Sequence, residues 1–426
     1  MDTEQVTALV IGDVALIVVA SWLLGALARR LGQPTVIGQI AAGIALGPTL
    51  LGRLPGDPTG ILFPPEVLPF LTVLSQVAVV IFMFLAGYEI NYRQLRGGGR
   101  SVLAVAVLAL LVPAALGTGA VTFLDGLFTA VEPDAGGGTF VMFMAVACSV
   151  TALPVLVAIV RERGMAGTPT GTIATTAAGI MDVVAWLVLA AAFAGTAAHS
   201  SGPSWLMALV LIVLFAAVMF LLVRPLLDRL LRRTESSLLS PVPLALGLAL
   251  GSAWVTSELG LHPVFGGFLA GLIMPRRNEV PDAEILRPME QTAGLLLPLF
   301  FVTTGLKFDI GTLDTDGLVL LALVLAIAVA GKLVPAYAAC RFTGLGPHQS
   351  ARVAALVNTR GLTELIVLNV ALEAGVIGPG LFTVLVLMAL VTTFMTGPLL
   401  TLIGRNERPE KENGRVDESA GRIQAQ

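Results

Sequence analysis

The sequence predicts an all-α polytopic membrane protein. Three observations point to it: an apolar composition, apolar segments of membrane-spanning length, and basic residues confined to alternate loops. Of the 426 residues, 56% are hydrophobic and 12% are charged, whereas about a quarter of a typical soluble protein is charged. Backbone groups in lipid must be hydrogen-bonded within the spanning segment, so we expect helices.

About 13 apolar segments are long enough to cross the bilayer, because about 20 helical residues span about 30 Å of hydrocarbon. The first follows "MDTEQ" without the basic leader of a signal peptide, so we expect it to remain. The ninth is shorter than the others. The expected helices, in order, are 7–29, 34–51, 67–90, 101–124, 139–160, 170–196, 203–226, 242–258, 262–275, 285–306, 316–340, 349–374 and 379–403.

The basic residues predict the orientation of these helices. Alternate loops and the C-terminal tail hold 21 of the 25 Lys and Arg residues, and the other side has only Arg53. By the positive-inside rule the C-terminus is cytoplasmic and, with an odd number of spans, the N-terminus is external. We therefore expect a multi-pass protein of the cell membrane, with residues 404–426 as a short, polar cytoplasmic tail.

Other global features argue against several classes of function. The net charge of −3 gives no indication of nucleic-acid binding. Cys148 and Cys340 lie in separate apolar segments, and the three histidines lie in different loops, so neither a disulfide nor a metal framework is expected. We find no phosphate-binding loop or nucleophile motif. We predict no enzyme activity, no cofactor and no ATP-driven pump.

Ionisable residues inside the apolar segments are the informative ones. An acid near the centre of a membrane helix costs about 2.5–3.5 kcal/mol and usually faces the bundle interior or a water-filled pathway. Asp182, in "GTIATTAAGIMDVVAWLVLAAAFAG", is the deepest acid that we identify. Lys332 lies deep in "LVLAIAVAGKLVPAY", whereas Lys307 and Glu89 lie nearer span ends, from which their side chains can snorkel to the interface.

Two predicted spans contain helix breaks at similar depth. "VACSVTALPVLVAI" places Pro154 in mid-membrane, and "LVNTRGLTELIVL" places residues 358–361 there. Paired breaks are typical of inverted-repeat transporters. The broken spans are the fifth and the twelfth, so they cross the membrane in opposite senses. This favours two inverted units, about 101–196 and 316–403.

Structural roles compete with functional ones at several of these positions. Arg360 and Glu364 are one helical turn apart, and we favour a simple i,i+4 ion pair. Lys332 could equally bind backbone carbonyls or act in transport. The hydroxyls of Ser149 and Thr151 could bond only to preceding carbonyls.

Several strings, taken together and in order, resemble the monovalent cation:proton antiporter-2 family. They are especially similar to plant cation/proton exchangers and to bacterial Kef-type and NapA-type transporters. The resemblance covers about residues 34 to 400. The strings are "GQIAAGIALGP", "IFMFLAGYEINYRQL", "CSVTALPVLVAI", "MDVVAWLVLA", "LPLFFVTTGLKFDI", "AGKLVPAY", "NTRGLTELIVLNVALEAGVI" and "VLMALVTTFMTGPLL".

The resemblance implies a fold with two crossed, broken helices and an acidic ion site beside the crossing. Asp182 matches the acid that binds cation and proton in turn, Thr151 lies at the matching break, and Lys332 matches the basic residue opposite the site. The family commonly has Asp, Asn or Gln before the acid, but this chain has Met181, which supplies no hard oxygen ligand. The family also implies that residues of about 101–196 and 316–403 form the core and that the remaining spans are the scaffold and dimerisation region of a homodimer.

We therefore expect residues 1–403 to form a secondary antiporter that exchanges Na⁺ or K⁺ for H⁺. A carboxylate can hold either a cation or a proton, and coupling follows if the bare anion does not move, because exposing an unpaired charge to low dielectric is costly. A monovalent cation would bind Asp182 and Thr151, with Ser149 and free backbone carbonyls completing its shell. Exchange is expected to be electroneutral.

Three alternatives remain open. One is a Kef-like K⁺ efflux pathway with channel-like behaviour, and another is a non-transporting membrane sensor or assembly subunit. Symport of an organic anion on a similar architecture is more distant.

Overall fold

A computed structural model describes residues 2–89, 99–133, 135–196, 205–234, 240–276 and 280–405. Arg93, Arg96 and Arg277 of the basic loops, and the predicted tail from residue 406 onward, lie outside these ranges. The helices are α1 (Thr3–Arg30), α2 (Thr35–Leu46), α3 (Pro58–Leu62), α4 (Leu68–Glu89), α6 (Arg100–Phe123), α7 (Asp125–Val131), α8 (Gly137–Ser149), α9 (Leu153–Glu162), α10 (Pro169–Thr196), α11 (Trp205–Val218), α12 (Arg224–Thr234), α13 (Val242–Glu258), α14 (Pro263–Ile273), α15 (Ala283–Leu306), α16 (Thr315–Phe342), α17 (Pro347–Val357), α18 (Leu362–Glu373) and α19 (Pro379–Arg405).

The all-helical prediction is confirmed, and each of the thirteen predicted segments contains helix. In the described part of the chain, ten helices, some of them made of two consecutive pieces, are long and apolar enough to cross a membrane. The helices α13 and α14 have 17 and 11 residues. The ninth predicted segment is therefore short in the structure as well.

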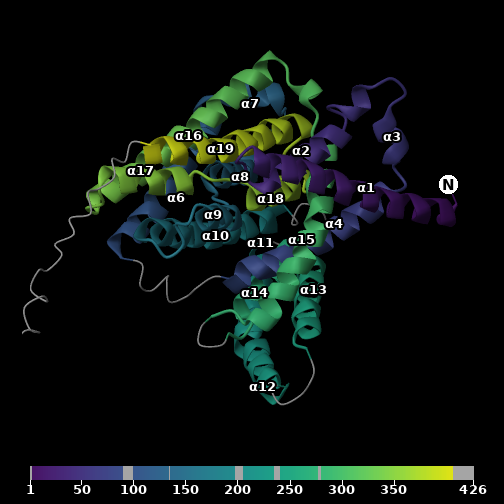
Figure 1. The fold of residues 1–426 in the computed structure, drawn as a ribbon, viewed down its shortest axis with the longest axis horizontal. Helices are drawn as coiled ribbons and strands as arrows, with labels where there is room; N and C mark the ends of the chain where they lie inside the picture. Colours follow the sequence, from purple (N-terminus) through teal and green to yellow (C-terminus); the bar gives the residue numbers. More distant parts are fainter. Residues whose placement is uncertain are drawn as a thin grey trace, which may run out of the picture.

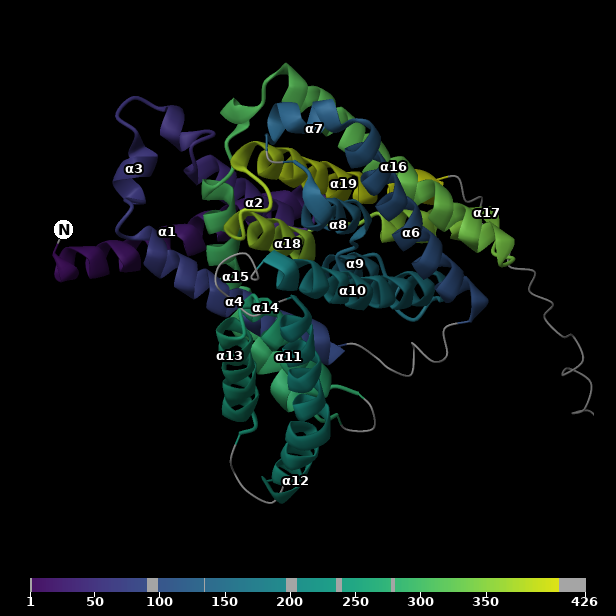
Figure 2. The ribbon, with the colours of Figure 1, turned by 180° about the vertical axis from the view of Figure 1, so that it is seen from behind.

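The helices form two packed groups, which can be followed in Figure 1 and, from behind, in Figure 2. In the first group α6 packs against α8 and α16, α10 packs against α6, α8 and α17, and α19 packs against α16, α17 and α18. In the second group α4 packs against α14 and α15, α2 against α1 and α15, and α13 against α14. The first group contains both broken helices.

Small residues let helices of the second group approach closely. A Cβ added to Gly43 of α2 would overlap the backbone of Phe301 and Val302 in α15, and one added to Gly271 of α14 would overlap the backbone of Phe84 in α4. Glycine at these positions thus allows close packing between helices of one chain.

The two helix breaks lie in direct contact. The first separates α8 from α9, and the second separates α17 from α18. The Thr151 hydroxyl donates a hydrogen bond to the Val357 carbonyl at 3.1 Å, and the Ala152 N–H donates to the Thr359 carbonyl at 3.2 Å. Gly361 precedes α18 with φ +150°, a conformation that glycine adopts without strain. The crossing brings four half-helix ends together.

Candidate functional site

Asp182 lies on α10 beside this crossing. Its residue is 3% exposed, and its Oδ1 atom has no hydrogen-bond partner among the described residues. The carboxylate accepts a hydrogen bond from the backbone N–H of Leu153, the first residue of α9, and Lys332 interacts with it electrostatically. The positive end of a half-helix thus faces the acid. A buried carboxylate with a free oxygen can accept a small cation or a proton.

Lys332, on α16, is completely buried and binds the end of α8. Its Nζ donates to the carbonyls of Ser149 and Val150, at 2.5 Å each. The last carbonyls of a helix lack partners within it and carry partial negative charge. Lys332 therefore caps a half-helix, which is the structural role weighed for it from the sequence, and still lies near Asp182.

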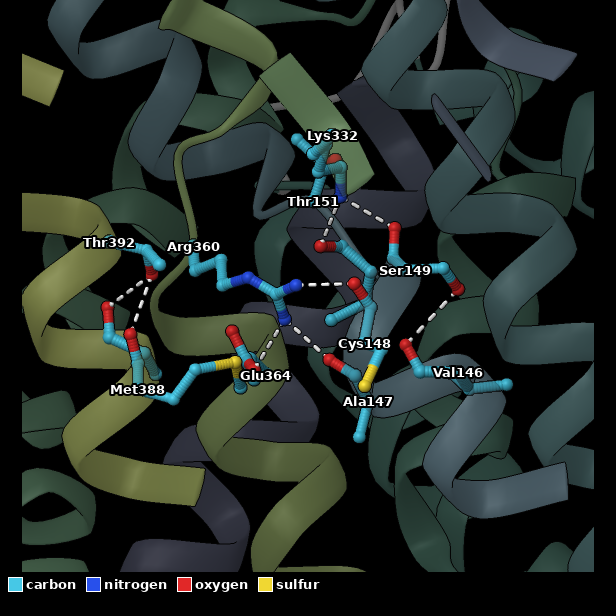
Figure 3. A network of polar contacts seen from close by, with 12 residues as sticks. Val146, Ala147, Cys148, Ser149, Thr151, Lys332, Arg360, Glu364, Met388 and Thr392 are labelled. Carbon is cyan, nitrogen blue, oxygen red and sulfur yellow. Dashed lines mark hydrogen bonds and ion pairs between the residues drawn. The ribbon is translucent and has the colours of Figure 1, made fainter. Parts of the chain in front are cut away.

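Arg360, in the second break, approaches the same half-helix from another direction (Figure 3). Its guanidinium donates to the carbonyls of Ala147 and Cys148 and to Oε1 of Glu364, the last at 2.7 Å. Both side chains of the pair are fully buried. The predicted i,i+4 ion pair is present, but the contacts of Arg360 with α8 connect the two broken helices.

The charges alternate around the crossing. Two cations, Lys332 and Arg360, bind the carbonyl end of α8. Two acids lie at amide ends, with Asp182 next to the start of α9 and Glu364 in the first turn of α18. Each charge therefore faces a helix end of opposite polarity, which reduces the cost of burying it.

The hydroxyls of Ser149 and Thr151 both donate to the backbone. Ser149 Oγ bonds to the Val146 carbonyl at 3.2 Å, and Thr151 Oγ1 bonds to Val357 across the crossing. Their oxygens keep lone pairs that a cation can use. The expectation of free carbonyls is wrong for residues 147–150, because Lys332 and Arg360 bind all four.

A cavity of about 430 Å³ reaches the start of α9, where Leu153 contacts Asp182. A second cavity of about 220 Å³ shares three of its lining residues, Glu89, Val157 and Arg161. Arg161 lies in the last turn of α9, on the side of the molecule that carries most of the basic residues. The site is thus approached from the side that the sequence predicts to be cytoplasmic.

The opposite approach is closed by polar contacts between the two helix groups. Lys307, which ends α15, donates to Asn369 and Glu373 of α18 at 3.0 Å each, and His262 lies 3.5 Å from Glu373. The cavity there measures only about 30 Å³. Lys307 lies at a helix end and is partly exposed, as expected, but its ammonium group is paired with Glu373.

An aromatic cluster lies one helical turn beyond Asp182. Trp186 of α10 contacts Phe265 and Phe268 of α14, with ring centroids 5.8 Å and 6.3 Å apart. These rings fill the contact between the two helix groups. Hydrated ions are excluded from such an apolar contact, which adds to the closure on this side.

Sequence reasoning gave no role to several buried polar residues that have atoms without partners in the described part of the chain. Asp13, within α1, is 3% exposed and its Oδ2 atom has no partner in the described part of the chain. Asn358, at the second break, and Thr176, on α10, also have side-chain atoms without partners there. Asp13 had a visible signal, an acid inside a long apolar segment. Asn358 and Thr176 gave no such signal of a functional role, because uncharged polar residues are common in membrane helices.

Comparisons of the sequence with known proteins point to cation/proton exchangers. The sequence profile of a family described as "Sodium/hydrogen exchanger, transmembrane" matches residues 14–405. The chain is 35% identical over 411 residues to the Na⁺/H⁺ antiporter NhaS4 of Synechocystis sp., covering 95% of this chain and 98% of that protein. It is 34% identical over 406 residues to cation/H⁺ antiporter 17 of Arabidopsis thaliana, covering 94% of this chain and 49% of that one.

A solved structure shares the fold. The sodium/proton antiporter MjNhaP1 from Methanocaldococcus jannaschii at pH 8 matches with a TM-score of 0.69 and 15% identity, over 94% of this chain and 99% of that one. The chain spans nearly the whole length of the Synechocystis and Methanocaldococcus proteins, and about half the length of the plant protein.

Proposed function

This chain belongs to the sodium/hydrogen exchanger family and is a monovalent cation/proton antiporter, and on that premise we propose that Asp182 binds the cation and the proton in turn. The observation that carries this proposal is the buried Asp182 carboxylate, which has a free Oδ1 atom next to the crossing of two broken helices. The cation is Na⁺ or K⁺.

The local chemistry supports alternate binding. A cation at Asp182 can be ligated by its carboxylate and by the oxygen of Thr151, with Ser149 as a further oxygen. Met181, the preceding residue, is completely buried and offers no oxygen ligand. One carboxylate cannot hold both species at once. If only the occupied site crosses the membrane, movement of the cation requires movement of the proton.

The proposal extends to the whole protein. Residues 1–403 form the exchanger, in which the core, 101–196 and 316–403, moves against the remaining helices of a homodimer. Contacts within each helix group are more extensive than most contacts between the groups, which supports this division. The basic side, onto which the larger cavity opens, is cytoplasmic.

The test is Asp182→Asn in proteoliposomes that contain a pH-sensitive dye. The amide preserves the size of the side chain but neither titrates nor carries charge, so cation-driven proton flux should fall to the level of empty vesicles. Yield and elution profile of the purified variant should match the parent protein. Normal exchange by the variant would refute the proposed role of Asp182.

A further inference from the structure

Thr176 of α10 differs from the other hydroxyls along the cavity. It lines the larger cavity, its residue is 5% exposed, and its Oγ1 atom has no hydrogen-bond partner in the described ranges. Threonine in a helix commonly bonds to the carbonyl three or four residues earlier. Thr175 does so, donating to Gly171 at 2.8 Å. The Thr176 hydroxyl is therefore a buried polar group that lines the cavity without a partner.

The position of Thr176 places it on the approach to Asp182. Thr172, Thr175, Thr176 and Gly179 line the cavity from one face of α10, and Asp182 follows Gly179 by three residues, about 60° round the helix and so beside the edge of that face. At about 1.5 Å per residue, Thr176 precedes Asp182 by about 9 Å along the helix axis. An ion moving along this face passes Thr176 first.

Gly179 leaves room between these two residues. A Cβ added there would meet only the Leu153 side chain, at 3.8 Å, which is ordinary van der Waals contact. Helix packing therefore does not require glycine at this position. A large side chain at residue 179 would project into the cavity that Thr176 lines.

The mouth of the cavity carries acidic groups. Glu89, at the end of α4, lines both cavities, and Glu290 of α15 and Arg161 lie close enough to interact with it. Arg161 offsets the charge of one carboxylate, so the group as a whole is negative or neutral and does not repel a cation. The cavity volume of about 430 Å³ accommodates a cation with many of its waters, since liquid water occupies about 30 Å³ per molecule.

We propose that Thr176 forms a waiting site, at which a monovalent cation exchanges part of its hydration shell for the threonine oxygen before it reaches Asp182. Water supplies the remaining ligands. Removing water in two steps lowers the cost of each step, because an oxygen ligand replaces each lost water. This inference rests on the proposed function, since it concerns the route by which the cation reaches Asp182.

The test compares Thr176→Val with Thr175→Val in the full chain. Both changes remove one hydroxyl from the same cavity, but only Thr176 lacks a backbone partner. In proteoliposomes, Thr176→Val should raise the half-saturating Na⁺ or K⁺ concentration roughly three- to tenfold, the equivalent of one lost polar contact. Thr175→Val should leave it unchanged, and Thr176→Ser should restore the parent value.

The outcomes separate this inference from the proposed function. If the parent protein exchanges ions and Thr176→Val has the parent's cation dependence, the waiting site is refuted while the role of Asp182 is unaffected. A merely structural role for Thr176 would lower the unfolding temperature without changing the half-saturating concentration. If the Val variant is not recovered folded, Thr176→Ala replaces it in the same comparison.

A second pair of variants tests the passage itself. Gly179→Ala adds a methyl group that fits at 3.8 Å, so exchange should persist. Gly179→Leu fills the passage and should abolish exchange in protein that elutes as the parent does. Undiminished exchange by folded Gly179→Leu would contradict a route along this face of α10.

Discussion

The hydroxyl of Thr151 has two roles at the crossing, because it bonds to the Val357 carbonyl and keeps lone pairs for a cation. Thr151→Val preserves shape but leaves that carbonyl without its donor, at a cost of about 1–3 kcal/mol. We expect a lower unfolding temperature and a several-fold weaker apparent cation affinity. Thr151→Ser should restore both.

These two readouts separate the two roles of Thr151. The unfolding temperature reports the hydrogen bond, and the cation dependence of exchange reports the ligand. A Val variant that loses stability but keeps the parent's cation dependence would restrict Thr151 to a structural role.

The sequence predicts buried charges better than it predicts their partners. Asp182, Lys332, Arg360 and Glu364 are visible because a charge inside an apolar segment must be compensated, and all four are buried in the structure. Their partners depend on contacts between segments far apart in sequence. Lys332 bonds to carbonyls more than 180 residues away, and no local pattern encodes that contact.

Two adjacent threonines also show that hydrogen-bond partners cannot be predicted from the sequence alone. Thr175 and Thr176 are identical in type and share one helix, yet only Thr175 bonds to the preceding turn. Side-chain rotamers and neighbouring helices decide which hydroxyl remains free. Lys307 is a further example, because its position near a span end is visible in the sequence while its partner Glu373 lies 66 residues further along the chain.

At the scale of elements, the half-helix α8 depends on cations from other elements. Arg360 binds two of its last carbonyls and the fully buried Glu364. Arg360→Met leaves the acid buried without its charge partner and removes a donor from both carbonyls, so we expect a loss of about 3–5 kcal/mol in stability. Thermal unfolding in detergent and recovery of monodisperse protein measure this loss.

The double variant Arg360→Met/Glu364→Met serves as the control for charge burial. Removing both partners eliminates the unpaired acid, so part of the lost stability should return. A single Arg360→Met variant as stable as the parent would show that this pair does not hold the crossing together.

Local chemistry explains why the helix breaks could be predicted. Pro154 lacks the N–H that continues a helix, so it lies in the first turn of α9, and Gly361 takes a backbone conformation that few other residues adopt. The sequence pattern also gives the order and approximate ends of the helices. It does not specify that Thr151 and Ala152 contact Val357 and Thr359, because each contact joins two segments that lie far apart in the sequence.

At the scale of the whole molecule, the orientation is open to direct measurement. Both native cysteines are buried, so a single introduced cysteine reports its own side of the membrane. Glu4 and Gln349 are exposed and lie at opposite predicted sides. Glu4→Cys should react with an impermeant maleimide in intact cells, and Gln349→Cys should react only after permeabilisation. The reverse pattern would invert the proposed orientation.

The charge of the whole site predicts the stoichiometry. Arg360 and Glu364 pair with each other, so Asp182 is the acid left to bind the transported species. A monovalent cation and a proton each add one positive charge to it. Because Met181 adds no second carboxylate, the two moving forms are electrically equal. We therefore expect 1:1 exchange that carries no net charge.

Lys332 is the residue that could alter this balance. Its Nζ already bonds to two carbonyls, which favours a fixed positive charge. If instead it released a proton whenever a cation bound, each cycle would move net charge. Exchange is measured in proteoliposomes with the membrane potential clamped by an ionophore for an ion that is not transported. Rates insensitive to potential support a single carrier at Asp182, whereas a potential dependence that vanishes in Lys332→Gln would make Lys332 a second proton carrier.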